Sequence, residues 1–322
     1  MLATTYTTAD RQYEIVRLSQ ESLPDVQYLF TLCFGFDPGY DQLYNKHVHC
    51  HGSEKFLGYI AYDLISKEAA AFYAVFPTFI TVDSERILGA QSGDTMTNPK
   101  HQKRGLFIHL AELTYNLCRQ SGIKLIYGFP NGNSHPGFIN KLDFQELPIL
   151  EEYCFVENRF ELNRFTKRNR FFASLHTKWI KFILYRFTHK SNEFQRTYFN
   201  QYSQVYIDQN YFDTKNGNYY WINSGRSSYW LKLNGNSLMI GDVANWSKED
   251  LLQFKRKMKF VAFFAGIRFV TFSVSPNHPH VSLLKSLKVD PVQSKQHVIV
   301  RSLEENISYN ELIFTGSDID VY

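Results

Sequence analysis

The chain has 322 residues, 44% of them hydrophobic and 20% charged, which excludes a disordered or fibrous protein and allows one large domain or two average ones. Its net charge of +4 is too small to indicate nucleic-acid binding by itself, although it suits an anionic ligand. The four cysteines form no CxxC pair, and the N-terminus lacks the pattern of a signal peptide. Since no segment approaches the roughly 18 apolar residues of a membrane span, we expect a cytoplasmic protein.

The N-terminal part predicts two helices and a meander of strands. Residues 13–19 alternate like a strand, residues 21–36 carry apolar residues at helical spacing after an N-cap-like Ser22, and residues 40–50 suit a second helix. From residue 56 to residue 97 the sequence is β-branched and aromatic, with breaks at Ser66–Lys67 and Asp83–Ser84. This pattern is typical of an antiparallel meander of three strands.

A helix and a buried strand follow. Residues 105–121 place leucines at spacings of four, three and four, which is one face of an α-helix, at Leu106, Leu110, Leu113 and Leu117. Gly122 stands where a helix-ending glycine is expected. The nearly continuous apolar run over residues 123–129 is typical of a strand covered on both faces.

Between the meander and this helix lies the stretch NPKHQKRGLF, residues 98–107. Pro99 lacks the N–H of a strand residue, and the chain then enters the first turn of a helix, whose leading N–H groups have no partner within the helix. Together with the helix dipole these donors form an anion site, and Gly105 lets a ligand approach the backbone. The alternative is a solvated basic loop in which Lys103 and Arg104 face water.

The second half of the chain echoes the first. Residues 122–124 (GIK) match residues 266–268 (GIR) at an offset of 144, and His135–Pro136 matches His278–Pro279 at an offset of 143. In both places a helix ends at the glycine, a strand follows, and an Asn/His/Pro turn leads to a short helix. A repeat of this length indicates duplicated domains.

The segment between the halves, residues 159–190, holds nine Lys and Arg against one acid, with eight aromatic residues among them. We expect a linker helix that packs on a domain through one side, formed by Phe172, Leu175, Trp179 and Phe182. Two alternatives stay open: a contact with an anionic membrane surface through Lys178, Lys181 and Arg186, and a contact with RNA by arginine and aromatic stacking.

Residues 12–150 resemble the GNAT acetyltransferase superfamily in element order and in one motif. The family's cofactor motif, Q/R-x-x-G-x-G/A, stands here as Gln102-Lys103-Arg104-Gly105-Leu106-Phe107. Downstream, FINKLDF at residues 138–144 occupies the place of the family's LYxKLGF. The chain departs from the family at three positions: Phe107 replaces a small residue, Ile139 stands where many members carry the tyrosine that protonates the departing thiolate, and Asp143 takes a glycine position.

With the repeat, the resemblance implies an α+β fold of two GNAT-like domains, each a mixed, mostly antiparallel central sheet flanked by helices. We expect a GNAT acetyltransferase domain with a CoA-binding loop over residues 1–158, a basic aromatic linker or helix over 159–190, and a degenerate GNAT-like domain over 191–322. The second domain is expected to be degenerate because its matching stretch, VANWSKEDL, has no glycine and carries Glu249 and Asp250, which would repel a pyrophosphate.

The same resemblance implies an N-acetyltransferase that transfers acetyl from acetyl-CoA directly to a primary amine of a small molecule or amino sugar. It assigns the pyrophosphate to the amides of Gln102, Lys103, Arg104, Gly105, Leu106 and Phe107, and the pantetheine arm to Thr95, Met96, Thr97 and Asn131. The backbone near Met96 or Thr97 would also supply the N–H donor for the tetrahedral oxyanion.

An alkylamine with a pKa near 10.4 must lose a proton before it attacks. Asp94 is the candidate base, with an ordinary turn aspartate as the alternative, and His101 and His109 are weaker candidates. Two other functions stay open. One is a non-catalytic CoA-binding protein, which the missing tyrosine favours. The other is an aminoacyl transferase of the cell-wall tandem-GNAT type, which would use the basic segment but would not need the phosphate loop.

The run HVHCH, residues 47–51, offers three histidines and a cysteine. Since no second ligand cluster follows at a matching spacing, we expect no metal site there and interpret the run as a polar wall of the acceptor cleft. We expect a small-molecule amine as partner and no DNA. A peripheral membrane contact and a homodimer stay open.

Overall fold

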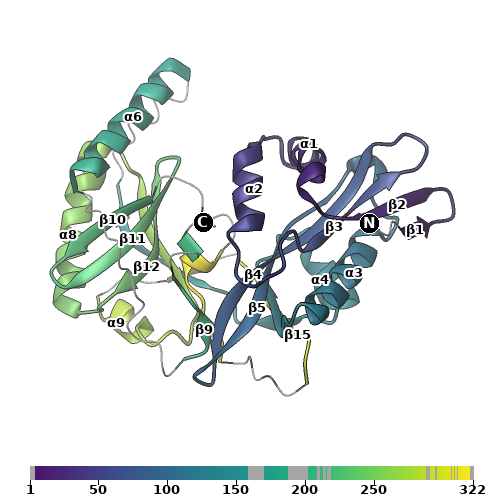
Figure 1. Cartoon of the computed structure of the whole chain (residues 1–322). Coiled ribbons are helices and arrows are strands. Elements are labelled where there is room, and N and C mark those ends of the chain that lie inside the picture. Colours follow the sequence, from purple (N-terminus) through teal and green to yellow (C-terminus); the bar gives the residue numbers. More distant parts are fainter. Residues whose placement is uncertain are drawn as a thin grey trace. The chain divides into compact units, whose positions relative to one another are not determined.

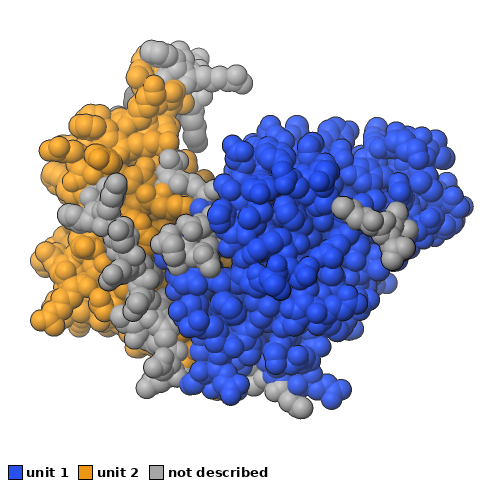
Figure 2. Space-filling model, viewed as in Figure 1, with its two compact units in different colours: residues 1–147, 205–216, 297–310 blue, residues 148–204, 217–296, 311–322 orange. Residues whose placement is uncertain are grey.

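The computed structural model describes residues 4–158, 170–187, 202–208, 211–212, 215, 219–287, 291–293, 296–305, 307, 309 and 311–319. The chain forms two compact units (Figure 2). The first unit comprises residues 1–147, 205–216 and 297–310, and the second comprises residues 148–204, 217–296 and 311–322.

The first unit is built on one mixed sheet. Its strands lie in the order β1-β2-β3-β4-β5-β6-β15-β7, with β9 paired to β4. Along the described path from β1 to β7, only β5 and β6 pair in parallel. The bounds of the strands are β1 (Thr4–Thr7), β2 (Gln12–Arg17), β3 (Gly58–Asp63), β4 (Ala69–Val82), β5 (Glu85–Thr97), β6 (Leu125–Gly128), β7 (Gln145–Leu147), β9 (Gln204–Val205) and β15 (Val298–Ser302). The helices are α1 (Leu23–Phe34), α2 (Tyr40–Val48), α3 (Leu106–Gln120) and α4 (His135–Lys141).

Helices cover both faces of this sheet (Figure 1). Because successive strand residues point to opposite faces, Phe72 and Ala74 of β4 pack in the core that α1 and α2 cover, whereas Tyr73 and Val75 pack in the core beneath α3 and α4. The predicted meander and the leucine-striped helix are therefore confirmed, with α3 beginning at Leu106 and ending at Gln120.

The second unit repeats the order of the first. Its sheet has the order β10-β11-β12-β13-β8-β14, and β12 and β13 are parallel, with a helix crossing between them as α3 crosses between β5 and β6. The strands are β8 (Glu151–Glu157), β10 (Tyr219–Ser224), β11 (Ser227–Asn234), β12 (Ser237–Ala244), β13 (Phe269–Val274) and β14 (Pro291–Gln293). The helices are α6 (Arg170–Phe187), α8 (Lys248–Ala265) and α9 (Val281–Ser286). The expected α+β class and the mixed, mostly antiparallel sheets are confirmed.

The two sheets exchange one strand each, which divides the chain differently from the predicted bounds. β15, from the end of the second half, lies between β6 and β7, and β8, from the end of the first half, lies between β13 and β14. The first unit therefore stops at Leu147, ahead of the expected boundary at residue 158, and takes in residues 297–310. A linear pattern cannot reveal this exchange, because β8 and β15 carry the same apolar alternation whichever sheet they join.

Helix α6 packs on the second unit through a side other than the predicted one. Ile180 and Leu184 are buried in the core of that unit, and His176 Nε2 lies 3.1 Å from the carbonyl oxygen of Ala265 on α8. The residues expected to face the domain, Phe172, Leu175, Trp179 and Phe182, are all exposed. The expected linker helix therefore exists over residues 170–187, while residues 159–169 and 188–190 of the basic segment lie outside the described residues.

None of the helices in the described part of the chain is long and apolar enough to cross a membrane.

Candidate active site

Helix α3 begins without a side-chain cap. Its N-cap residue is Gly105, at φ 77°, which has no side chain to accept a hydrogen bond from the first-turn N–H groups, and the first turn contains no acid. A Cβ at residue 105 would lie 2.7 Å from Tyr6 Oη. Any residue with a side chain would also be strained at this positive φ. Both conditions favour glycine and leave the leading N–H groups of α3 available to an anion.

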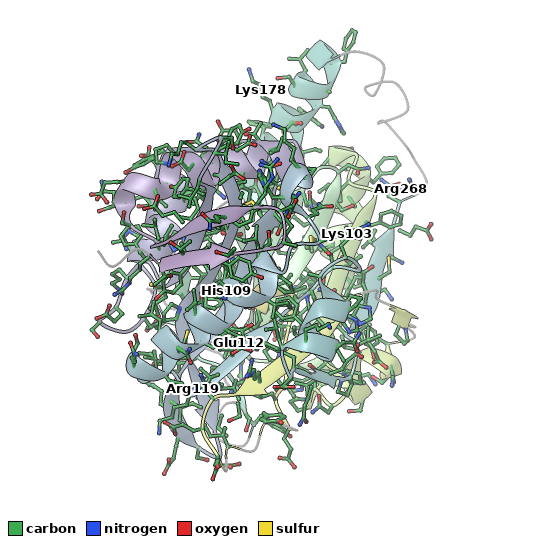
Figure 3. All side chains as sticks on the ribbon, turned by 90° about the vertical axis from the view of Figure 1, so that its right-hand side faces the viewer. Lys103, His109, Glu112, Arg119, Lys178 and Arg268 are labelled. Atoms are coloured by element: carbon green, nitrogen blue, oxygen red, sulfur yellow. The ribbon has the colours of Figure 1, made fainter. Side chains whose placement is uncertain are left out.

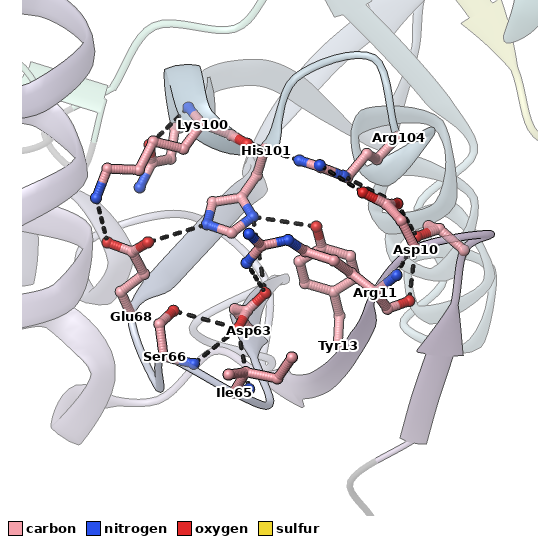
Figure 4. Close-up of polar contacts among 12 residues, drawn as sticks. Asp10, Arg11, Tyr13, Asp63, Ile65, Ser66, Glu68, Lys100, His101 and Arg104 are labelled. Atoms are coloured by element: carbon pink, nitrogen blue, oxygen red, sulfur yellow. Dashed lines mark hydrogen bonds and ion pairs between the residues drawn. The ribbon is translucent and has the colours of Figure 1, made fainter.

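A polar network beneath the loop holds this helix start in place (Figure 4). His101 is fully buried, with Nδ1 3.0 Å from Tyr13 Oη and Nε2 3.2 Å from Glu68 Oε1. Asp63, also fully buried, accepts hydrogen bonds from Arg11 and from the amide and hydroxyl of Ser66. Burial would raise the pKa of Asp63, but these hydrogen bonds outweigh it and hold the pKa below its usual value. His101 therefore anchors the loop and cannot reach a substrate as a base.

The loop's positive charge is mostly neutralised by its neighbours. The guanidinium of Arg104 lies 2.7 Å from Asp10 Oδ2 and donates to the carbonyl oxygen of Lys100, whose own Nζ lies 3.2 Å from Glu68. Lys103 is exposed and makes no ion pair among the described residues (Figure 3). The anion-binding capacity of this stretch therefore comes from the backbone and from Lys103, while the side chain of Arg104 braces the loop.

Phe107, the large residue in the motif's last position, turns inward. Its ring packs against Phe138 with centroids 5.1 Å apart and against Tyr73 at 6.0 Å. It fits because Gly137 on α4 has no side chain: a Cβ there would lie 2.5 Å from the Phe107 ring. The phenyl ring therefore lies in the core between α3 and α4, and the amide of residue 107 stays at the helix start.

Strands β5 and β6 part beside this helix start. They pair only from Gly89–Leu125 to Ser92–Gly128, where β6 ends, whereas β5 continues alongside β4 to Thr97. The pairing of β4 with β5 shifts register between Phe72 and Ala74, which places a bulge at Asp94, a residue at φ 55°. Residues 95–97, assigned to the pantetheine arm, thus run along an edge that β6 does not cover.

Asp94 is held in an ion pair at this bulge. Its two carboxylate oxygens lie 2.9 and 2.8 Å from Lys46 Nζ, and the side chains are 8% and 15% exposed. Lys46 comes from α2 and also lies over the Phe76 ring at 4.2 Å. Lys46 was not predicted, because a lysine 48 positions away along the chain gives no local signal of this contact.

The other predicted residues fall at different depths around this region. Asn131 is exposed, and its side-chain oxygen accepts hydrogen bonds from the amides of Asn133 and Ser134, so it shapes the turn before α4. Ile139, at the position of the family's tyrosine, packs against the core of the first unit. His109 lies on the outward side of α3 (Figure 3), where its ring stacks on Tyr6 with centroids 4.3 Å apart, and burial lowers its pKa.

The three histidines of the HVHCH run do not converge. His47 is buried among Phe56 and Phe76, His51 is buried with Nε2 2.9 Å from Asp208, and His49 is exposed. The expectation of a continuous polar wall is therefore wrong, because two of the three rings pack inside the first unit.

The corresponding helix start in the second unit is closed. The hydroxyl of Ser247 caps α8 by accepting a hydrogen bond from the amide of Asp250, and Glu249 and Asp250 occupy the first turn. The Asp250 carboxylate accepts a further hydrogen bond from the amide of Arg226. With one donor capped and two acids beside it, this end of α8 is unsuited to a phosphate, whereas the start of α3 has the uncapped donors of an anion site.

Residues 14–147 match the model of a family described as an acetyltransferase (GNAT) domain. The first unit of this chain is a GNAT domain. The match spans β2 to β7, so it includes the helix start at Gly105, the parting of β5 and β6, and the turn that leads to α4. A comparison with curated proteins finds no match.

Solved structures similar to the whole chain share this GNAT fold. A GCN5-related N-acetyltransferase from Kribbella flavida has a TM-score of 0.56 at 13% identity, with 90% of this chain and 71% of that chain covered. A probable N-acyltransferase from Enterococcus faecalis has a TM-score of 0.58 at 12% identity, with 91% and 73% covered. The N-myristoyltransferase of Saccharomyces cerevisiae, with bound myristoyl-CoA, has a TM-score of 0.53 at 9% identity, with 92% and 83% covered. These alignments extend over both units.

Proposed function

We propose that the GNAT domain binds acetyl-CoA and transfers the acetyl group directly to a primary amine of a small molecule or amino sugar. The observation that carries the proposal is the start of α3, where an uncapped set of N–H groups and Gly105 lie next to the strand edge that β6 leaves open. The N–H groups suit the pyrophosphate, and the edge over residues 95–97 suits the amide groups of a pantetheine arm. The neighbour with myristoyl-CoA bound supports an acyl-CoA as donor.

The chemistry needs an oxyanion donor, a base and a proton source. In the proposal, the β5 backbone near Met96 and Thr97 donates to the oxyanion, and Asp94 accepts the amine proton directly or through water. Lys46 orients that carboxylate at the bulge. Since Ile139 has no proton to give to the leaving thiolate, that proton comes from solvent or is the one that Asp94 has taken from the amine.

Binding can be tested with two matched pairs of variants. Gly105 and Gly122 stand at opposite ends of α3 at nearly the same positive φ, 77° and 74°, so Gly105→Glu and Gly122→Glu impose similar backbone strain, and they differ in that only the Cβ at residue 105 also meets Tyr6 Oη. Acetyl-CoA and CoA should raise the melting temperature of the wild type and of Gly122→Glu but not of Gly105→Glu, because only residue 105 adjoins the phosphate site. Likewise Lys103→Ala should weaken binding, whereas Lys100→Ala, which removes a lysine already paired with Glu68, should not. A full shift in Gly105→Glu would remove the site assignment.

Turnover is tested separately from binding. Free thiol release is measured with acetyl-CoA and with longer acyl-CoAs over a panel of amines and amino sugars. Binding with no thiol release over the whole panel would favour the second candidate, a non-catalytic CoA-binding protein, which the apolar Ile139 supports.

A further inference from the structure

Three potential metal ligands from distant parts of the chain meet on one side of the GNAT sheet. They are His135, the first residue of α4, Glu146 in β7, and His297, which directly precedes β15. One ligand atom from each lies within 4.8 Å of the other two, and all three residues belong to the first unit.

The strand register explains why these side chains share a face. Glu146 lies opposite Ile299 in the antiparallel pair of β7 and β15. Directly opposed residues point to the same face, and His297, two positions before Ile299, points there too. Ile299 packs in the core beneath α3 and α4, so this is the face on which α4 lies and from which His135 approaches.

The distances suit a small divalent cation. His135 Nε2 lies 3.2 Å and His297 Nδ1 lies 2.6 Å from Glu146 Oε1, and the two imidazole centroids are 4.2 Å apart. In a tetrahedral zinc site with bonds of about 2.0–2.1 Å, ligand atoms are about 3.3 Å apart, so the His135–Glu146 pair already has the required spacing. His297 Nδ1 is closer to Glu146 Oε1 than this spacing, so binding of the ion would replace that hydrogen bond and move the two atoms apart.

The donor set and its exposure suit the same ion. Two imidazoles and one carboxylate are the protein ligands of many zinc sites that keep a fourth position open. The side chains of His135, His297 and Glu146 are 20%, 31% and 40% exposed, so solvent reaches the cluster and water can complete the coordination.

We propose that His135, Glu146 and His297 form a Zn²⁺ site that fastens the start of α4 to the β7–β15 edge of the GNAT sheet. The site would fix the turn that carries Asn131, since that turn connects β6 to α4. The inference rests on this geometry and is independent of the proposed acyl transfer.

The test uses the full chain after treatment with a chelator and dialysis. Titration with Zn²⁺ is followed by calorimetry, and Co²⁺ is added in parallel because its visible absorption reports the ligand set. The wild type should bind one equivalent of Zn²⁺ and gain melting temperature. Glu146→Gln and His297→Ala should each weaken binding by about tenfold or more and remove the gain. His49→Ala is the matched control, an exposed histidine of the HVHCH run, and should bind like the wild type.

Two results would overturn the zinc site. One is no binding to the wild type beyond that of the double variant Glu146→Gln/His297→Ala. The other is that the double variant gives the same Co²⁺ spectrum as the wild type while His49→Ala gives a different one, which would place the metal in the HVHCH run.

A second, independent observation concerns the exposed side of α6 and α8. We define the aromatic face of the second unit by its exposed members on the two helices: Phe172, Leu175, Trp179, Phe182 and Tyr185 on α6, and Phe260, Phe263 and Phe264 on α8. Trp179 Nε1 donates to the carbonyl oxygen of Phe264, so the two helices present one continuous face.

This face is basic as well as apolar. Lys178 and Arg186 are exposed beside the α6 stripe, and Arg256 and Lys259 are exposed on α8. Helix α6 contains no acidic residue, and the acidic residues of α8 lie only in its first turn. Next to Phe263, an open pocket of about 440 Å³ is lined by Lys255 and Lys259 and by one acid, Glu157.

We infer that the aromatic face docks on a bilayer surface that contains anionic lipids. Aromatic side chains enter the headgroup region and the flanking lysines and arginines face anionic headgroups, as in interfacial amphipathic helices. A second copy of the chain is a poorer partner, because two copies that dock through this face would bring their positive charges together.

Co-sedimentation with vesicles tests this surface. The chain should sediment at low salt with vesicles of phosphatidylcholine and phosphatidylglycerol, and not with phosphatidylcholine alone. The double variant Phe182→Ser/Phe263→Ser should lose about tenfold or more of the binding. Ile65→Ser, which removes an 80% exposed apolar residue from the first unit, is the control and should bind normally. No sedimentation at low salt, or equal binding by the double variant, would overturn the inference, as would a dimer in solution that the double variant dissociates.

Discussion

The effect of Gly137→Ala on stability should change sign with the residue at position 107. An ideal Cβ at residue 137 would lie 2.5, 3.2 and 3.6 Å from three atoms of the Phe107 ring. Since carbon atoms in contact are about 3.5–4.0 Å apart, the ring must move by about 1 Å. It cannot move freely, because it packs against Phe138 and Tyr73.

The expected magnitude follows from two opposing effects. Replacing glycine by alanine in a helix stabilises by up to about 1 kcal/mol, whereas overpacking of a core costs about 1–3 kcal/mol. Gly137→Ala should therefore destabilise the wild type by about 1 kcal/mol, which lowers the melting temperature of a unit of this size by about 2–4 °C. In the Phe107→Ala background the clash is absent, and the same change should stabilise by about 0.5–1 kcal/mol.

The assay can assign the effect to the correct unit. All four tryptophans, Trp179, Trp221, Trp230 and Trp246, belong to the second unit. Tryptophan fluorescence therefore follows the second unit, while far-ultraviolet circular dichroism follows both. Gly137→Ala should shift the dichroism transition and leave the fluorescence transition in place. If Gly137→Ala stabilises the chain with Phe107 present, the packing described for α3 and α4 is wrong.

Three further predictions concern charge, chemistry and capping. Because hydrogen bonds hold the pKa of Asp63 low, its ionised form stabilises the fold fully above the unfolded-chain pKa of about 3.9, and this stabilisation is lost as the pH falls below that value. In Asp63→Asn, the free energy of unfolding of the first unit, measured with urea, should therefore fall less steeply below about pH 5. With Asp94 as the base, Asp94→Asn should lower kcat by about 100-fold or more with little change in acetyl-CoA affinity, and unchanged steady-state kinetics would exclude that role. Ser247→Ala removes the cap of α8 and should cost about 1 kcal/mol, visible in tryptophan fluorescence; an equal loss in the first unit would contradict the assignment.

Local signals were sufficient for the elements around Gly105. The leucine spacing predicted α3, Pro99 predicted the end of β5, and the stretch around Gly105 predicted a helix start, because each depends on residues within one or two turns of the chain. The sequence also predicted that the start of α8 is less suited to an anion, since Ser247, Glu249 and Asp250 lie within four residues of one another.

Predictions of which side chains point into the core were wrong in two places. The stripe at Phe172, Leu175, Trp179 and Phe182 has the spacing of a buried helix face, yet the neighbouring Ile180 and Leu184 are buried instead. A helix with apolar residues around much of its circumference does not specify by pattern which side packs. The prediction for the HVHCH run was wrong for a similar reason, because aromatic rings distant from His47 in the sequence, those of Phe56, Phe72 and Phe76, surround it.

By itself, then, the sequence determined a GNAT-like order of elements and a helix start at Gly105, since helix ends depend on nearby residues. The tertiary structure alone decided that Asp10 neutralises Arg104, that Lys46 holds Asp94, and that His135, Glu146 and His297 meet at one sheet edge. Those contacts arise from strand order and from the exchange of β8 and β15, which bring together residues that are far apart along the chain.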